Sequence, residues 1–210
     1  MTDELLLEGD GLRGFRTVMA VCAEALLNLP TEDVVANVRS VAEALGDDEF
    51  NDVVADAALE QRYYDRFFVS AHPAYVPLCE DAVRGGYMDD DRFRYGSVCG
   101  KHYAHTLTCY KAVGFDFRRI EGFEPSVSML KPDSMASELA FLAFLADSAL
   151  AAESRDSEVA QRSRELLVTF ARDHASRWFG DAVECLERFD EDFYAGVCAL
   201  AAESVAALVE

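Results

Sequence analysis

One segment of the chain carries four side chains that could ligate a transition metal. At spacings of three and four residues it presents Cys99, His102, His105 and Cys109. At 100° per residue these positions fall within an arc of about 120° on a helix, and their thiolates and imidazoles suit zinc, copper or iron. Positions three apart on one helix offer two ligands to an ion rather than four. A semi-polar helix face is therefore the favoured interpretation, and a metal or haem protein using Cys99, His102 and His105 is the alternative.

Motifs that mark enzymes are missing from the sequence. It contains no G-x-S-x-G, no glycine-rich phosphate loop, no H-E-x-x-H and no paired-cysteine zinc signature. We therefore predict that the protein is not an enzyme and has no resident cofactor.

The stretch from Lys131 to Leu145 predicts the central helix. Its apolar positions Met135, Leu139, Phe141, Leu142 and Leu145 cover more than half of a helical circumference, so other helices must surround it. Glu138 lies inside this apolar arc and must find a hydrogen-bond partner or become neutral. Before the helix, Pro132 suits a first turn, and Asp133 or Ser134 can cap it.

Composition restricts the class of protein and its partners. The 210 residues are 51% hydrophobic, which predicts one folded domain over residues 1–210. A net charge of −20, from 39 acidic and 19 basic side chains, argues against nucleic acid and anionic membranes as partners. The N-terminal segment lacks the features of a secretory signal, and no stretch is apolar enough to insert stably in a bilayer. We therefore expect a cytoplasmic protein.

Hydrophobic periodicity predicts helices and no strand. The fold expected is all-α, a single globular bundle of about seven to nine helices. Predicted helices cover approximately residues 12–29, 31–46, 48–69, 90–113, 132–150, 157–174, 178–187 and 192–208. Two irregular surface segments, 70–81 and 115–130, interrupt them, and the second is long enough to favour a functional loop or exchange of helices between two chains.

Aromatic residues gather at the end of the third predicted helix, beside the first irregular segment. Phe68 ends this helix, and Pro73 and Pro77 make the following crossing extended. Together with the capped Pro-Asp-Ser corner they could form an apolar groove with a polar rim, which is typical of a peptide-binding site. The alternative is a hairpin packed on the core.

Four sequence segments together resemble one family. They are RYYDRFFVSAHPAYVPLCEDAV, the tyrosine-glycine helix end from Tyr110 to Gly114, KPDSMASELAFLAFLA, and FARDHASRWFGDAVECLE. The chain resembles the TorD/DmsD family of redox-enzyme maturation chaperones, related to the delta-type nitrate reductase assembly proteins. The central segment resembles the family's Pro-Asp-His followed by E-L-x-F-x-x-x-L, with Ser134 in place of histidine. The last segment resembles its F-x-x-x-H-x-x-x-W, through Phe170, His174 and Trp178.

The resemblance implies a chaperone that binds a twin-arginine signal peptide. Its client would be the catalytic subunit of a molybdopterin oxidoreductase, held as the apo form until cofactor insertion. Pro132, Asp133 and Ser134 would line the peptide site, and Phe68, Pro73 and Pro77 would face them.

Charge complementarity adds Glu80, with Asp81 and Asp133, as an acidic rim for the two arginines. Glu138, His174 and Trp178 are predicted to support the site structurally. The sequence leaves both a monomer and a homodimer open.

Overall fold

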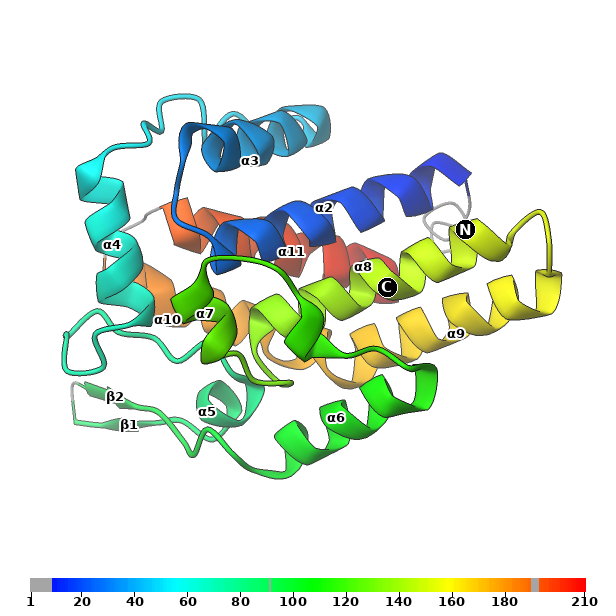
Figure 1. Ribbon diagram of the computed structural model, residues 1–210. Helices are drawn as coiled ribbons and strands as arrows, with labels where there is room; N and C mark the ends of the chain where they lie inside the picture. The colour runs from blue at the N-terminus through cyan, green and yellow to red at the C-terminus, as the bar shows by residue number, and fades with distance from the viewer. Residues whose placement is uncertain (1–8, 91, 190–192) are drawn as a thin grey trace.

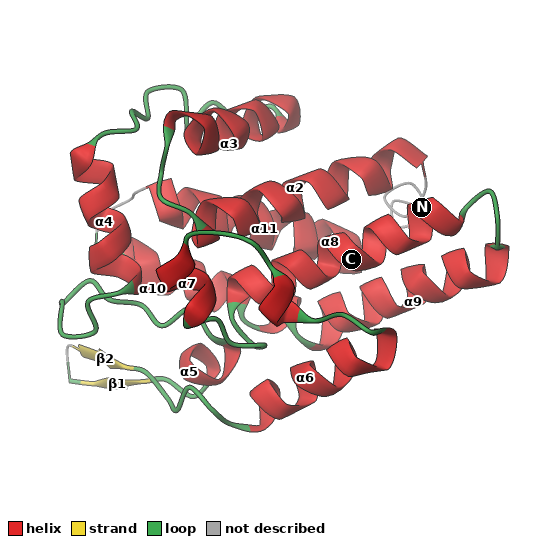
Figure 2. Ribbon diagram, in the orientation of Figure 1, coloured by secondary structure: helices red, strands yellow, loops and turns green. Residues whose placement is uncertain are grey.

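The computed structural model describes residues 9–90, 92–189 and 193–210, and the all-α prediction is confirmed for them. The helices are α2 (Gly9–Leu27), α3 (Glu32–Leu45), α4 (Ala57–Phe67), α5 (Glu80–Arg84), α6 (Lys101–Val113), α7 (Glu124–Ser128), α8 (Met135–Ala152), α9 (Ser157–Asp173), α10 (Phe179–Glu187) and α11 (Phe193–Val209). Short 3-10 turns, η1 (Phe117–Arg119) and η2 (Ala175–Arg177), and a hairpin of β1 (Tyr87–Asp89) and β2 (Arg92–Arg94) complete them. Figures 1 and 2 show α4 and α7 at one end of the bundle and α6 along its lower edge.

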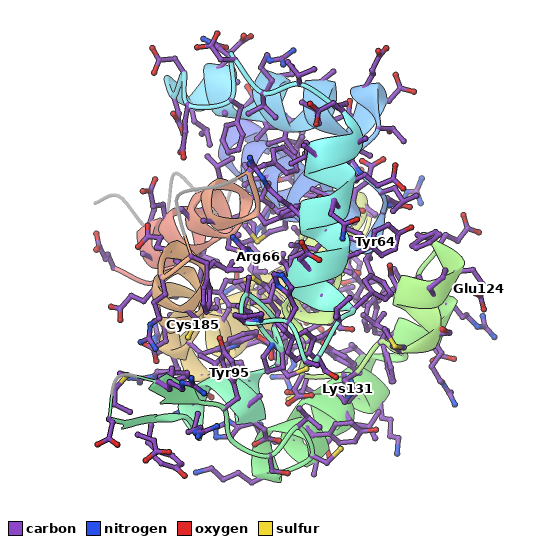
Figure 3. All side chains as sticks on the ribbon, turned by 90° about the vertical axis from the view of Figure 1, so that its left-hand side faces the viewer. Tyr64, Arg66, Tyr95, Glu124, Lys131 and Cys185 are labelled. Atoms are coloured by element: carbon purple, nitrogen blue, oxygen red, sulfur yellow. The ribbon has the colours of Figure 1, made fainter. Side chains whose placement is uncertain are left out.

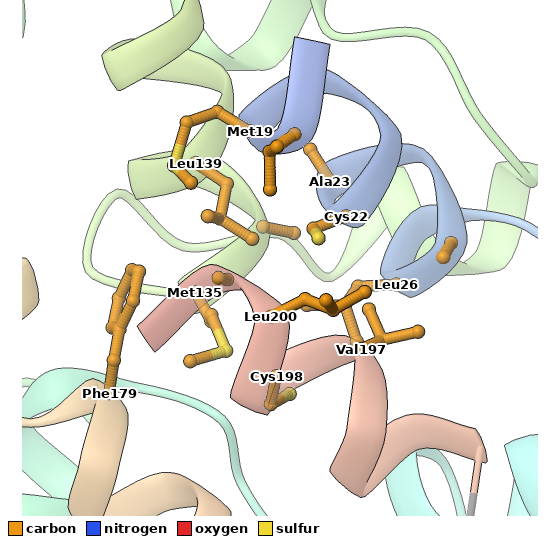
Figure 4. Packing of buried hydrophobic residues seen from close by; sticks show 14 of the residues in the cluster. Met19, Cys22, Ala23, Leu26, Met135, Leu139, Phe179, Val197, Cys198 and Leu200 are labelled. Carbon is orange, nitrogen blue, oxygen red and sulfur yellow. The ribbon is translucent and has the colours of Figure 1, made fainter. Parts of the chain in front are cut away.

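Helix α8 is the centre of the bundle, as its apolar circumference predicts. It packs against α2 and α9, and α11 packs against α2, α9 and α10. Figure 4 shows Met19 and Cys22 of α2 meeting Leu139 of α8 and Leu200 of α11. The prediction that no stretch is apolar enough for a bilayer is wrong for α8 by length and composition: within the described residues this helix could cross a membrane, but 61% of it is buried against its neighbours. Its apolar surface therefore belongs to the protein core.

Capping residues fix several boundaries where the sequence places them. The hydroxyl of Thr31 accepts the backbone N–H of Val34 at the start of α3, and Gly46 ends α3 with φ of 86°. This left-handed conformation costs glycine little because it has no Cβ. At α8 the cap is Ser134, whose Oγ accepts the N–H of Ser137. Pro132 lies in the turn before the helix rather than in its first turn.

The third helix is shorter than predicted. It begins at Ala57 rather than near residue 48, because Asp56 accepts the N–H groups of Ala58 and Leu59 and caps it there. In the preceding loop, the guanidinium of Arg39 donates to the carbonyl oxygens of Phe50 and Val53. These side-chain contacts replace the helical hydrogen bonds that periodicity alone suggested.

The predicted helix over 90–113 is also partly wrong. Its first part instead contributes strand β2, in which Phe93 pairs with Met88 of the preceding β1, and α6 begins only at Lys101. The carboxylate of Asp81 sets this start, since it accepts the backbone N–H groups of Gly100, His102 and Tyr103. A Cβ at position 100 would lie 2.7 Å from that carboxylate, so glycine permits the close approach.

The second irregular segment contains more structure than predicted. Between Phe115 and Leu130 the chain forms η1 and the short helix α7. Asp116 accepts the N–H of Arg118 at the start of η1, and Pro125 occupies the first turn of α7. Ser126 of α7 lies 2.7 Å from the hydroxyl of Tyr63, so the segment places α7 against α4.

Candidate functional site

An apolar groove lies where α4, α7 and the start of α8 meet. Its cavity measures about 170 Å³. The lining residues are Leu26, Leu27, Tyr63, Phe67, Phe68, Tyr75, Val76, Pro77, Leu78, Cys79, Val98, Ser126, Met129, Leu130, Lys131, Ser134 and Ala136. Figure 3 shows this end of the molecule, with Tyr64 on α4, Glu124 on α7 and Lys131 nearby. Lys131 is the one residue with a formal charge among the described residues that line the groove.

Aromatic rings of α4 form one wall of the groove. Tyr64 and Phe68 are one helical turn apart, and both pack edge-on against Phe123, the residue before α7. The hydroxyl of Tyr63 lies 3.1 Å from the carbonyl of Leu26 and 2.7 Å from Ser126 Oγ. The bulky end of this helix, visible in the sequence, therefore joins α4 to α2 and α7.

The Pro-Asp-Ser corner lies on the opposite side, where Ser134 reaches the lining of the groove. The backbone N–H of Met135 donates to the carbonyl of Leu78, and the N–H of Glu80 donates to the carbonyl of Asp133. Cys79 and Ser134 pair as an isolated antiparallel bridge. The corner and the proline-bearing crossing therefore lie side by side, as the sequence analysis predicts.

The predicted peptide-binding residues divide into two groups. Phe68, Pro77 and Ser134 line the groove. Pro73 is exposed but lies outside the lining, while Pro132, Asp133 and Glu80 are buried beneath it.

The predicted acidic rim is wrong. Glu80 and Asp133 have no exposed surface, and Asp81 is 9% exposed because it caps α6. The burial of these carboxylates has no sign in their spacing, since they accept hydrogen bonds from segments remote in sequence. Asp133 Oδ2 accepts the N–H of Asp81, and burial raises the pKa of Asp133 to about 6.

Glu80 is the centre of a buried ionic cluster. Its two oxygens lie 2.6 Å from Arg84, 2.8 Å from His102 and 2.6 Å from His174 Nδ1. Burial opposes ionisation of Glu80, but the hydrogen bond and the charge of His174 lower its pKa. Burial also opposes protonation of His174, yet hydrogen bonds to Cys109 and Glu80 raise its pKa to about 10. The structure therefore favours a carboxylate paired with an imidazolium.

Glu138 finds the partner that its position in the apolar arc demands. The indole N–H of Trp178 donates to Glu138 Oε2 at 3.0 Å, and both side chains are fully buried. Burial and the neighbouring charge of Glu80 raise the pKa of Glu138 well above its usual range. Phe170 stacks on His174 with ring centroids 4.7 Å apart. The three residues predicted as structural support thus lie together in the core behind the corner.

Sequence reasoning missed Tyr110 and Arg84. The hydroxyl of Tyr110, which is fully buried, donates to the carbonyl of Pro132 at 2.7 Å. The sequence analysis named Tyr110 only as part of a helix end, because its reach to the corner depends on how α6 packs. Arg84 follows Glu80 by four residues, and this helical ion-pair spacing was the signal available for it.

The metal ligands predicted as an alternative are not all brought together. Cys99 is exposed and precedes α6, so it does not share a helical face with the histidines. In the described chain, metal-binding groups instead combine His105 and Cys109 with His174, and His102 with Glu80 and His174.

Comparisons with known proteins identify the family. A model of the family described as nitrate reductase delta subunit matches residues 30–184. The fold is similar to a crystal structure described as that of a redox enzyme maturation protein from Archaeoglobus fulgidus, with a TM-score of 0.50, 22% identity, and coverage of 90% of this chain and 91% of that one. No curated protein sequence matches the chain. Because the family match spans most of its length, this chain belongs to the nitrate reductase delta subunit family, a family of redox-enzyme maturation chaperones.

Proposed function

We propose that this chain is a cytoplasmic chaperone that binds the twin-arginine signal peptide of a molybdopterin oxidoreductase subunit. It would hold the apo subunit until its cofactor is inserted, without catalysing a reaction. Family membership supports the class of function. The observation that carries peptide binding is the apolar groove between α4, α7 and the Pro-Asp-Ser corner.

The groove suits the apolar part of such a peptide. Its walls are aromatic and aliphatic, and a buried leucine or phenylalanine contributes about 1.5–3 kcal/mol. Phe68 is half-buried and anchors one wall through its contact with Phe123. Two or three apolar peptide residues in this groove would therefore supply most of the binding energy.

The two arginines of the peptide require a different position. The charged side chain at the groove is Lys131, which repels a guanidinium. The chain as a whole carries a net charge of −20, which attracts a cationic peptide over a longer range. We therefore expect the arginines to remain at the solvent-exposed surface and to affect mainly the rate of association and its salt dependence.

One chain supplies every residue of the groove, so a monomer is sufficient for the proposed binding, and a homodimer is compatible with it.

Calorimetric titration with a synthetic twin-arginine signal peptide tests the proposal. Phe68→Ala should weaken binding about tenfold, which corresponds to about 1.4 kcal/mol, because it removes an aromatic wall. Tyr87→Ala, at an exposed aromatic of the hairpin, is the matched control and should leave the affinity unchanged. Equal affinities for wild type and Phe68→Ala, in a variant shown to be folded, would rule out this groove.

A further inference from the structure

A second cavity lies between α6 and α9, separate from the apolar groove. It measures about 450 Å³. The residues around it are His105, Thr108, Cys109, Ala112, Val113, Phe141, Arg162, Leu166, Thr169, Phe170, Asp173 and His174. It shares no lining residue with the groove. Three of these side chains, those of His105, Cys109 and His174, have nitrogen or sulfur atoms that could ligate one metal ion.

These three donors already lie close together. His105 and Cys109 are one turn apart on α6, and His174 follows the end of α9. Their ligand atoms lie within 4.8 Å of one another, and His105 Nδ1 is 2.7 Å from His174 Nε2. Tetrahedral zinc, with bonds of about 2.0–2.3 Å, requires ligand atoms roughly 3.3–3.7 Å apart. A small outward rotation of His105, which is exposed, would provide that separation.

His174 is oriented as metal-bound histidines commonly are. Its Nδ1 lies 2.6 Å from the buried carboxylate of Glu80, which leaves Nε2 directed at His105. A carboxylate on the far nitrogen fixes the ring and increases the basicity of the ligating nitrogen. Stacking on Phe170 holds the ring plane as well.

The other group of candidate ligands is a poorer site. It consists of Glu80, His102 and His174. Arg84 donates to Glu80 at 2.6 Å, so a divalent cation there would lie close to a guanidinium. Glu80 therefore acts better as the hydrogen-bond partner of His174 than as a ligand.

We propose that His105, Cys109 and His174 bind zinc, with a fourth coordination position open to the cavity. Binding releases the proton on Nε2 of His174 and the thiol proton of Cys109 to solvent, while Nδ1–H of His174 stays bonded to the Glu80 carboxylate. Two imidazoles and one thiolate are a donor set that zinc favours, and three protein ligands leave one position for water or a small anion. This site differs from the Cys99, His102 and His105 set suggested by spacing. It also goes beyond the proposed chaperone function, because it uses none of the groove residues.

Cobalt(II) titration of the chelator-treated full chain tests the proposal. Bound cobalt should produce a thiolate-to-cobalt charge-transfer band and tetrahedral d–d bands, and zinc should displace it. Cys109→Ser should abolish the charge-transfer band, whereas Cys99→Ser, at an exposed cysteine before the same helix, should preserve it. His105→Ala should weaken cobalt and zinc binding at least tenfold.

Absence of a thiolate band in the wild type, or the same band in folded Cys109→Ser, would overturn the proposal. If Cys109→Ser fails to fold by circular dichroism, His105→Ala decides the question, since its exposed side chain is not needed for the core. Unchanged zinc affinity in His105→Ala would then reject the site. Phe68→Ala should bind zinc normally, so failure of the metal site and failure of the groove give different results.

Discussion

The apolar groove and the buried cluster around Glu80 lie on opposite sides of the same turn but are built differently. The groove is lined by aromatic and aliphatic side chains with one cation, Lys131. The cluster buries Glu80 and His174, and Glu138 is buried beside it. The motif residues Asp133, His174 and Trp178 all belong to the buried side. In this molecule most of the recognisable motif builds the scaffold, and side chains outside the motif form most of the groove that we propose as the peptide site.

Among the variants that test this difference, His174→Ala should cause the largest loss in the free energy of unfolding. It leaves the Glu80 carboxylate buried without its closest imidazole, and breaking a buried ion pair costs about 3–5 kcal/mol. Urea unfolding monitored by circular dichroism measures the loss. His72→Ala removes a histidine only 3.9 Å from Asp65 at the surface, and should change stability by less than about 1 kcal/mol. Similar losses in the two variants would show that the cluster is not a stabilising element.

The second prediction concerns the pH dependence of stability that arises from the ionisation of Asp133. Its pKa rises from 3.8 to about 6 on folding, so between these values the folded state binds more protons than the unfolded state. Stability contributed by Asp133 is therefore fully present below the lower value and is lost as pH rises through about 6, by up to about 3 kcal/mol. Asp133→Asn should remove this part of the profile. The measurement is the difference in unfolding free energy between wild type and variant from about pH 4 to 7. A pH-independent difference would contradict the raised pKa.

Asp81→Ala separates capping from peptide recognition. Three backbone N–H groups at the start of α6 lose their acceptor, and loss of an N-terminal cap costs about 1–2 kcal/mol. Thermal unfolding should show this destabilisation while calorimetry with the signal peptide shows unchanged affinity. A marked loss of affinity in a variant of normal stability would restore the acidic-rim hypothesis.

The smallest effect, on peptide affinity, is expected from removing the charge of Lys131 at the groove. Lys131→Gln removes the cation that faces an arginine-bearing peptide, and an exposed charge pair contributes a few tenths of a kcal/mol to about 1 kcal/mol. Peptide affinity should rise slightly, and more at low salt than at high salt. Titrations at two ionic strengths test this, and weaker binding by the variant would mean that Lys131 contacts the peptide favourably.

The helical elements could be predicted from sequence because their causes are local. Apolar periodicity located α8, and Thr31 with Gly46 defined both ends of α3. The errors arose where a remote side chain sets a boundary, as Asp81 does for α6. Periodicity contains no information about such contacts.

Part of the site could be predicted for the same reason. Phe68 and Pro77 follow from an aromatic helix end and a proline-bearing crossing, and both line the groove. The burial of Glu80 could not be predicted, because a carboxylate in an exposed-looking segment has no local sign that His174, 94 residues away, will meet it. The pairing of Trp178 with Glu138 depends in the same way on how α8 and α10 pack.

The most direct test of the account is photo-crosslinking of a twin-arginine signal peptide that carries benzoylphenylalanine in its apolar run. Mass spectrometry of the adduct identifies the contact. If the groove binds the peptide, attachment is expected at groove residues of α4, the 75–79 crossing or the 126–131 segment. Attachment chiefly to α6 or α9, on the side of the buried histidines, would contradict it.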